Sequence, residues 1–237
     1  MKIALIGYGK MGKAIEEIAL QKGHEIILKI GTANLHEFIE ERIAQADVCI
    51  EFSTPEAAFE NIKKCLSCGI PTISGSTGWL HHLEEAGAIC VQHETAFLYA
   101  SNFSIGVNLF FKINEYVAAL MESYPEYRVS MQEIHHTAKK DSPSGTAVTL
   151  AESILKHLPG KDKWVNEATE SASELAILSQ RTDPAPGTHT IFYDSEIDSI
   201  EIKHTAHSRM GFAYGAVLAA EFIQGKEGLY EMKDVLG

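Results

Sequence analysis

The chain has 237 residues and a formal net charge of −12, with 45% hydrophobic and 22% charged residues. This balance is typical of a globular protein with enough apolar material for two modest domains. The acidic charge argues against a general nucleic-acid or anionic-membrane binder, because both need a basic surface, so we expect neither partner. An anionic small ligand is still compatible with a few local cations or helix N-termini.

The first hundred residues alternate between short apolar runs and segments with helical spacing. Strands are expected at Lys2–Ile6, Glu25–Ile30, Val48–Phe52, Thr72–Ser74, Ala88–Gln92 and Ala96–Tyr99, with helices at Met11–Leu20, from Pro55 to about Cys68, and at Leu80–Ala86. Strands that alternate with helices predict an α/β fold in which helices cover both faces of a parallel sheet.

The pattern changes after Asn102. Helices are expected at Val107–Met121, Gly145–Leu158 and Phe212–Ile223, and strands at Tyr127–His135, Thr188–Tyr193 and Ser199–His204. The last two strands alternate as an antiparallel pair would, so this part is expected to be a smaller α+β domain with a mostly antiparallel sheet. Prolines and glycines between residues 158 and 188 indicate a loop-rich segment, and the final helix is expected to pack back on the first domain.

Four cysteines, Cys49, Cys65, Cys68 and Cys90, include one C-x-x-C pair. No second pair stands at zinc-finger spacing, and the pair precedes a glycine that suggests a helix C-terminus, where a thiolate is disfavoured. We therefore interpret them as buried reduced cysteines. With no recognisable targeting or membrane-spanning segment, the expected location is the cytoplasm.

A glycine-rich turn, Gly7-Tyr8-Gly9-Lys10-Met11-Gly12, lies between the first expected strand and helix. Glycine lets the backbone make this turn and approach a pyrophosphate at the helix N-terminus. A βα turn without a ligand is the alternative, but strand, helix and second strand all stand where the motif requires them. The turn predicts a Rossmann dinucleotide-binding domain.

The end of the second expected strand lacks the carboxylate that usually binds the ribose hydroxyls of NAD. Gly31-Thr32-Ala33 stands there instead, and Lys10 and Lys29 are possible partners for a 2′-phosphate. We therefore expect NADPH, or both NADPH and NADH, rather than strict use of NADH.

A histidine- and lysine-containing loop spans residues 133 to 147, with the sequence EIHHTAKKDSPSGTA. Adjacent histidines at a strand end face opposite ways and Lys139 repels cations, so we expect no metal site. Ser144-Gly145-Thr146 opens a helix whose amides suit a carboxylate, with Lys139 and Lys140 nearby. A histidine side chain can gain or lose a proton near neutral pH, so the residue type at position 135 suits general acid catalysis, although a plain helix cap and an exposed turn remain the alternative.

This loop resembles the signature of the dihydrodipicolinate reductase family, the 4-hydroxy-tetrahydrodipicolinate reductases of bacterial lysine biosynthesis. The resemblance extends over nearly the whole chain, through Glu51-Phe52-Ser53, Gly75-Ser76-Thr77-Gly78, Ala100-Ser101-Asn102-Phe103-Ser104, His204–Arg209 and Phe212-Ala213. It implies reduction of 4-hydroxy-tetrahydrodipicolinate by NADPH or NADH with loss of water, in the diaminopimelate route.

Residue roles follow from the same resemblance. His135 and Lys139 would be catalytic, His136, Ser144, Gly145 and Thr146 would bind the dicarboxylate substrate, and the cofactor would lie against Gly7, Tyr8, Gly9, Lys10, Met11, Gly12, Gly75, Ser76, Thr77, Ala100, Ser101, Asn102 and Phe103. Residues 1–103, completed by 210–237, would form the dinucleotide domain. Residues 104–209 would form the substrate-binding and tetramerisation domain, which implies a homotetramer.

The sequence departs from the family pattern at several positions. It has Gly187-Thr188-His189 where the family often has G-E-H, Tyr214 where asparagine is common, and Ser142 in place of a common alanine. Two other functions are compatible with the fold: another Rossmann oxidoreductase, such as an amino-acid dehydrogenase, and a non-catalytic nucleotide sensor. Retention of both His135 and Lys139 favours an enzyme.

Overall fold

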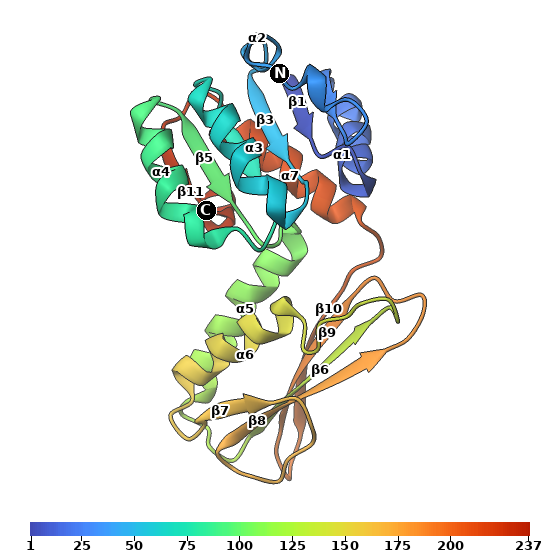
Figure 1. Ribbon diagram of the computed structural model, residues 1–237. Helices are drawn as coiled ribbons and strands as arrows, with labels where there is room; N and C mark the ends of the chain where they lie inside the picture. Colours follow the sequence, from blue (N-terminus) through green and yellow to red (C-terminus); the bar gives the residue numbers. More distant parts are fainter. The chain divides into compact units, whose positions relative to one another are not determined.

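The computed structural model describes every residue from Met1 to Gly237. The chain divides into two compact units, drawn in Figure 1. One unit contains Met1–Ile105 together with Arg209–Gly237, and the other contains Gly106–Ser208.

The first unit is built on a six-stranded parallel sheet with the order β11-β5-β4-β3-β1-β2. Its strands are β1 (Lys2–Ile6), β2 (Glu25–Ile30), β3 (Val48–Glu51), β4 (Thr72–Ser74), β5 (Ala96–Tyr99) and β11 (Gly228–Tyr230). The central strands are buried on both faces, which is why they read as continuous apolar runs in the sequence. The predicted parallel α/β sheet is confirmed.

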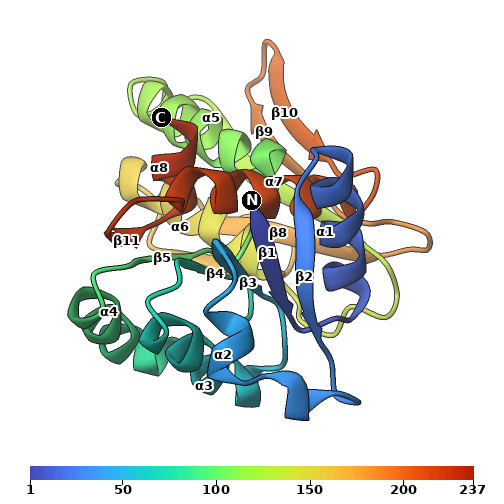
Figure 2. The ribbon, with the colours of Figure 1, turned by 90° about the horizontal axis from the view of Figure 1, so that it is seen from above.

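Helices cover both faces of this sheet, as Figure 2 shows. On one face, apolar residues of α1 (Lys10–Gln21), α7 (Met210–Ile223) and α8 (Met232–Leu236) share a core with the sheet. The other face is covered by α2 (Glu40–Ile43), α3 (Pro55–Ser67) and α4 (Leu83–Gln92), with short 3₁₀ turns at Leu35–Glu37 and Leu80–His82. The C-terminal helix α7 belongs to the first unit and packs against α1.

One expectation for this unit is wrong. Residues 88–92, predicted as a strand, are the second half of α4. The buried residues of that helix, Ala86, Gly87 and Cys90, recur at helical spacing, and this short apolar run fits either structure when read alone. The C-terminal strand β11 and helix α8 are additions that sequence patterning did not indicate.

The second unit holds a five-stranded sheet with the order β10-β9-β6-β8-β7. Its elements are α5 (Ile105–Met121), β6 (Arg128–His135), α6 (Gly145–His157), β7 (Lys163–Val165), β8 (Glu174–Arg181), β9 (Thr188–Asp194) and β10 (Ser199–Thr205). The apolar residues of α5 and α6 share a core with one face of the sheet, and Figure 1 shows both helices along that face.

This sheet is mixed rather than mostly antiparallel. The pairs β9–β10 and β6–β9 are antiparallel, as expected, whereas β6–β8 and β7–β8 are parallel. Strands β7 and β8 lie within the segment that was expected to be loop-rich. In β8, buried Leu175 and Ile177 alternate with more exposed residues, so the prolines and glycines near this segment only delimit its strands.

Alternation along β6 positions the polar residues of the second unit. Val129, Met131, Glu133 and His135 are buried, while the residues between them are partly exposed. A glutamate and a histidine therefore continue the row of side chains that faces the apolar core. His135 is the last residue of the strand, where the chain turns toward α6.

The cysteines are all free, and Cys49, Cys65 and Cys90 are buried, in agreement with their interpretation as reduced core residues. No helix of the chain combines the length and the apolar character that crossing a bilayer demands.

Candidate active site

Four loops of the first unit leave the same edge of its sheet. They follow the carboxyl ends of β1, β3, β4 and β5, and they are Gly7–Gly12, Phe52–Thr54, Gly75–Gly78 and Ala100–Phe103. Ligands of open parallel sheets bind outside this edge. Three of these loops carry the residues that the sequence assigned to a cofactor.

The first loop has the close packing that a dinucleotide turn requires. Gly7 has a φ of +99°, and a β-carbon there would lie 2.1 Å from the carbonyl oxygen of Phe52. A β-carbon on Gly12 would lie 2.5 Å from the Gly7 carbonyl oxygen. At Gly9, the N-cap of α1, nothing lies within 4 Å of that position, so the backbone there is open to a ligand.

The loop after β4 is held by a buried carboxyl group. Glu51 accepts hydrogen bonds from Ser74 Oγ at 2.6 Å, from Ser76 Oγ at 2.9 Å, and from Ser53. Burial raises the pKa of Glu51, and the bonds from these serines partly oppose that effect. The Ser76 carbonyl also accepts from Trp79 Nε1, so Ser76 fixes the loop, whereas Thr77 beside it is exposed.

The loop after β5 is anchored by packing. Phe103 is 2% exposed and lies 5.5 Å, between ring centroids, from Phe52. The Ala100 amide bonds the Ser74 carbonyl, and Asn102 Oδ1 accepts from the Ser104 amide. These contacts tie the fourth loop to the second loop and to the end of β4.

Lys29 is not available as a free cation. Its Nζ lies 2.7 Å from Glu16 Oε1, and the other oxygen of Glu16 accepts a hydrogen bond from Tyr8. The expected pairing of Lys29 with a 2′-phosphate thus meets a competing carboxylate from α1. The exposed Lys10 makes no such ion pair.

A cavity of about 410 Å³ lies beside the glycine turn and is lined by Gly7, Gly9, Gly31, Thr32 and Thr54, among others. Its walls include apolar Ile6, Ile30 and Leu35. An apolar cavity beside an open helix N-terminus fits the adenosine and pyrophosphate parts of a dinucleotide. These residues therefore fit NADPH or NADH.

In the second unit, Glu133 is the centre of a buried polar cluster. Its Oε2 lies 3.4 Å from His135 Nε2 and 3.6 Å from His189 Nε2, and the two ring nitrogens are 3.3 Å apart. Its Oε1 accepts from Arg181 Nη2 at 3.0 Å and from Ser179 Oγ at 2.8 Å. Burial alone would raise the pKa of Glu133, but hydrogen bonds from the histidines and serines hold it well below its usual range.

The same cluster fixes the start of α6. The Ser144 amide donates to the Glu133 carboxylate at 3.1 Å, and Ser144 Oγ accepts from the Ala147 amide as a helix N-cap. Ser144 Oγ also lies 3.1 Å from His189 Nε2. Ser144 is 2% exposed, whereas Gly145 is exposed and Thr146 half-buried at the N-terminus of the helix.

The loop between β6 and α6 carries Lys139, whose Nζ is paired with Asp141 Oδ2 at 2.9 Å. Arg181 Nη2 donates to the Asp141 carbonyl at 2.6 Å. Thr137 is tied to Asp183 through its amide and hydroxyl. The structure thus brings His135, His136, Lys139 and the start of α6 together on one fixed loop.

Glu133, His135 and His189 also place three possible metal-ligand atoms within 4.8 Å of one another, a grouping that sequence spacing did not indicate. The single carboxylate of the group is already paired with the Arg181 guanidinium. A metal ion would therefore face a fixed cation beside its only charged ligand. We interpret the group as a hydrogen-bonded cluster.

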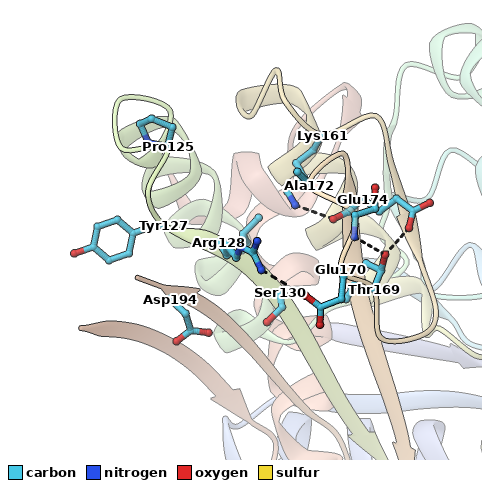
Figure 3. Close-up of a pocket in the computed structure, with 13 residues that line it drawn as sticks. Pro125, Tyr127, Arg128, Ser130, Lys161, Thr169, Glu170, Ala172, Glu174 and Asp194 are labelled. Atoms are coloured by element: carbon cyan, nitrogen blue, oxygen red, sulfur yellow. Dashed lines mark hydrogen bonds and ion pairs between the residues drawn. The ribbon is translucent and has the colours of Figure 1, made fainter. Parts of the chain in front are cut away.

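A second cavity of about 370 Å³, shown in Figure 3, lies at the opposite end of β6, around Arg128. Arg128 faces Glu170 at 3.6 Å, and Lys161 Nζ donates to the Glu174 carbonyl at 2.8 Å. Because one carboxylate and one carbonyl already engage the two cations, this cavity does not favour a dicarboxylate.

Comparison with known proteins agrees with this geometry. The family model described as "Dihydrodipicolinate reductase, N-terminus" matches residues 1–103, and the model described as "Dihydrodipicolinate reductase, C-terminus" matches residues 106–236. The chain belongs to this family. As a family member it is an oxidoreductase that uses NADH or NADPH.

Individual relatives agree with the family assignment. A 4-hydroxy-tetrahydrodipicolinate reductase of Christiangramia forsetii is 48% identical over 241 residues, covering 100% of this chain and 98% of the relative. The enzyme of the same name from Neisseria meningitidis is 34% identical, covering 94% and 84%. The dipicolinate-bound dihydrodipicolinate reductase of Paenisporosarcina sp. TG-14 has the same fold, with a TM-score of 0.78 at 22% identity, covering 98% and 97%.

Sequence reasoning assigned no role to four residues of the Glu133 cluster. Glu133 and His189 lie within sequence motifs that predict no role for them, and Arg181 and Ser179 lie outside those motifs. Glu133 had a usable signal, because residues two apart on a strand share a face, which places it beside His135. His189, Arg181 and Ser179 reach the cluster only through strand pairing, and one sequence does not reveal that pairing.

Proposed function

We propose that the chain catalyses the reduction of 4-hydroxy-tetrahydrodipicolinate to tetrahydrodipicolinate, with loss of water, in the diaminopimelate route to lysine. The observation that carries this proposal is the buried contact of His135 with Glu133 and His189, beside the capped start of α6 and within a chain that matches the family over its length. Residues 1–103 with 210–237 serve as the cofactor domain, and residues 104–209 as the substrate domain.

His135 and Lys139 transfer protons in this reaction. The nicotinamide cofactor supplies the hydride, so the chain itself has to orient the substrate, bind its charge and supply a proton. His135 is held at the end of β6, and Lys139 lies on the loop that follows it. Lys139 also supplies positive charge for a dianionic substrate, in competition with its ion pair to Asp141.

The substrate carboxylates bind at the start of α6. Gly145 and Thr146 provide amides at a helix N-terminus, where the helix dipole favours negative charge, and His136 provides a ring nitrogen. Ser144 uses its amide and its hydroxyl within the chain, so its part in binding is to hold the helix start in place.

The cofactor binds along the carboxyl edge of the parallel sheet. Its pyrophosphate lies at the glycine turn formed by Gly7, Tyr8, Gly9, Lys10, Met11 and Gly12, and the other contacts come from Gly75, Ser76, Thr77, Ala100, Ser101, Asn102 and Phe103. The open position at Gly9 supports this assignment. We expect use of NADPH, or of both NADPH and NADH.

The enzyme assembles as a homotetramer through the second unit. One face of that sheet packs on α5 and α6, while Leu178, on the other face, is 43% exposed and Phe192 and Ile134 are partly exposed. An uncovered apolar sheet face favours association. Light scattering should give a mass close to four chains.

The protein acts in the cytoplasm. Its four cysteines are free, as is usual for proteins of a reducing compartment.

Turnover tests the function directly. Freshly generated 4-hydroxy-tetrahydrodipicolinate should cause rapid oxidation of NADPH or NADH, which is measured as the loss of absorbance of the reduced nicotinamide. His135→Gln should abolish most of this oxidation. Oxidation of neither cofactor would favour a nucleotide sensor. Turnover of an amino acid with NADP, without activity on the ring substrate, would favour an amino-acid dehydrogenase.

A further inference from the structure

The two oxygens of Glu133 face different groups. Oε1 is engaged by Arg181 and Ser179, at 3.0 and 2.8 Å, which fixes the orientation of the carboxylate. Oε2 is then directed at the ring nitrogens of His135 and His189, at 3.4 and 3.6 Å. One carboxylate therefore contacts both imidazoles in a buried setting, where electrostatic interactions are strong.

The protonation of this cluster is constrained. Hydrogen bonds hold the pKa of Glu133 below its usual range, so the carboxylate is ionised, while burial lowers the pKa of His189, so that ring is neutral near pH 7. A consistent arrangement has the Nε2–H groups of His135 and neutral His189 both directed at the Glu133 carboxylate, with Ser144 Oγ as a second acceptor 3.1 Å from His189 Nε2. The carboxylate thereby selects the tautomer of His135.

That tautomer directs the other nitrogen of His135, Nδ1, away from the cluster. Nδ1 makes no hydrogen bond within the chain, and it is the atom left for proton exchange with a substrate. Gly187, with a φ of +155°, lies against this edge of the ring, since a β-carbon there would be 3.0 Å from His135 Cε1. The glycine at position 187 thus leaves the Nδ1 side of the His135 ring free of a neighbouring side chain.

From this geometry we infer that Glu133 and His189 are positioning residues of the reductase, which fix the tautomer and orientation of His135 and couple it to the substrate-binding start of α6. The coupling runs through Ser144, whose amide bonds Glu133 and whose hydroxyl contacts His189. The inference rests on the proposed role of His135 in proton transfer. It follows the same physical logic by which a buried carboxylate holds a catalytic histidine in hydrolases.

Several other charged or titratable groups face this cluster. Arg181 on β8 balances the charge of Glu133, Lys139 and Asp141 lie on the loop after β6, and His204 on β10 pairs opposite His189. The positive charge of Lys139 contributes to lowering the pKa of His189. With Arg181 balancing Glu133, an anionic substrate is not repelled by a buried negative charge.

Glu133→Gln and His189→Gln test the inference. Glu133→Gln removes the charge that favours protonated His135, so the limb of the kcat–pH profile that His135 sets should move to lower pH, and kcat should fall about 10²-fold or more. Nitrogen-15 NMR of the imidazoles should show loss of the Nε2–H tautomer of His135. His189→Gln keeps a polar atom near the Nε2 position and should retain more activity than His189→Asn.

Matched controls separate positioning from general damage. Glu174→Gln changes another glutamate of the same sheet outside the cluster, and His36→Gln changes an exposed histidine of the first unit. Both should keep the wild-type kcat and pH profile. Affinity for NADPH, from fluorescence titration, should be unchanged in every variant, since the dinucleotide binds the other unit.

The inference is overturned if folded Glu133→Gln keeps the wild-type pH profile and His135 tautomer, or if His189→Gln and His189→Asn are equally active. Stoichiometric zinc in the purified protein whose removal abolishes turnover would also overturn it. His135→Gln, measured in parallel, tests the proposed function itself. An inactive His135→Gln with wild-type-like Glu133 and His189 variants rejects only the positioning role, whereas a fully active one rejects the catalytic assignment.

Discussion

Glu51 and Glu133 are both completely buried in strands, one in each unit, yet their surroundings drive them toward opposite protonation states. Around Glu51, burial dominates and raises the pKa, because its partners are neutral serines. Burial also acts on Glu133, but hydrogen bonds from two histidines and two serines outweigh it and lower the pKa. Burial alone therefore does not determine the charge of either residue.

Replacing Glu51 with glutamine should remove a pH-dependent loss of stability. A carboxyl group whose pKa is raised on folding stabilises the native state below its ordinary pKa of 4.5, and this contribution is lost as pH rises through the folded value. The difference in unfolding free energy between the two proteins should thus shift in favour of Glu51→Gln as pH rises through the folded pKa of Glu51. Urea unfolding at several pH values measures it, and a pH-independent difference would contradict the raised pKa.

Helix α7 should not tolerate a methyl group at Gly215. A β-carbon there would lie 1.7 Å from the carbonyl oxygen of Phe103, so helix or loop must move. We expect Gly215→Ala to lower the unfolding free energy by about 3 kcal/mol and to weaken NADPH binding, because Phe103 lies in a loop that we propose binds the cofactor. Gly211→Ala, where the nearest atom is Ser104 Oγ at 3.8 Å, is the control. Equal melting temperatures for the two variants would show that the contact between Gly215 and Phe103 leaves room for a methyl group.

Local patterns were sufficient for most of the first unit. The run Lys2–Ile6, the glycine turn and the strand Glu25–Ile30 form one βαβ unit, whose apolar spacing and turn chemistry agree with each other. Residues 88–92 were misassigned because a short apolar run does not distinguish a helix from a strand. The packing of α4 against β11 and β5 determines that these residues are helical.

The Glu133 cluster shows where a single sequence is insufficient. Its residues come from three strands, and His189 lies opposite Glu133 only because β9 pairs with β6 in one register. Strands β7 and β8 were also missed, since their parallel pairing is set by contacts distant in sequence. Sequence indicated which strand end carries His135, but not the partners that fix its ring.

Cofactor preference should respond to charge around the second strand. Gly31→Asp should fit without a clash, because a β-carbon there would meet its nearest neighbours, Asn34 and Tyr8, at 3.9 Å. The new carboxylate would repel a 2′-phosphate, so it should weaken use of NADPH more than use of NADH. Glu16→Gln should act in the opposite direction, because it releases Lys29 from its ion pair. The ratio of kcat/KM for the two cofactors measures both effects. An unchanged ratio in both variants would place the 2′-phosphate elsewhere.

Single and double replacements of His135 and Lys139 should not be additive. Each should lose roughly 10²–10⁴-fold in kcat, a common range for general acid–base groups, and Lys139→Ala should also raise KM by removing positive charge. Because we propose that both residues act in one transition state, the double variant should lose less than the product of the single losses. Lys156→Ala, at the far end of α6, is the control for lost positive charge. Independent, multiplicative losses would indicate separate steps.

Inhibition by flat ring dicarboxylates should report on the start of α6. Pyridine-2,6-dicarboxylate offers two carboxylates, one for the amides of Gly145 and Thr146 and one for the positive charge of Lys139, whereas benzoate offers only one. We expect the dicarboxylate to compete with substrate at a much lower concentration than benzoate, and this advantage to shrink in Lys139→Ala, which removes one partner. Raising the salt concentration should weaken the dicarboxylate more than benzoate, because more charge is paired. Inhibition constants from steady-state kinetics give the comparison, and similar constants for the two compounds in the wild type would rule out the two-carboxylate geometry.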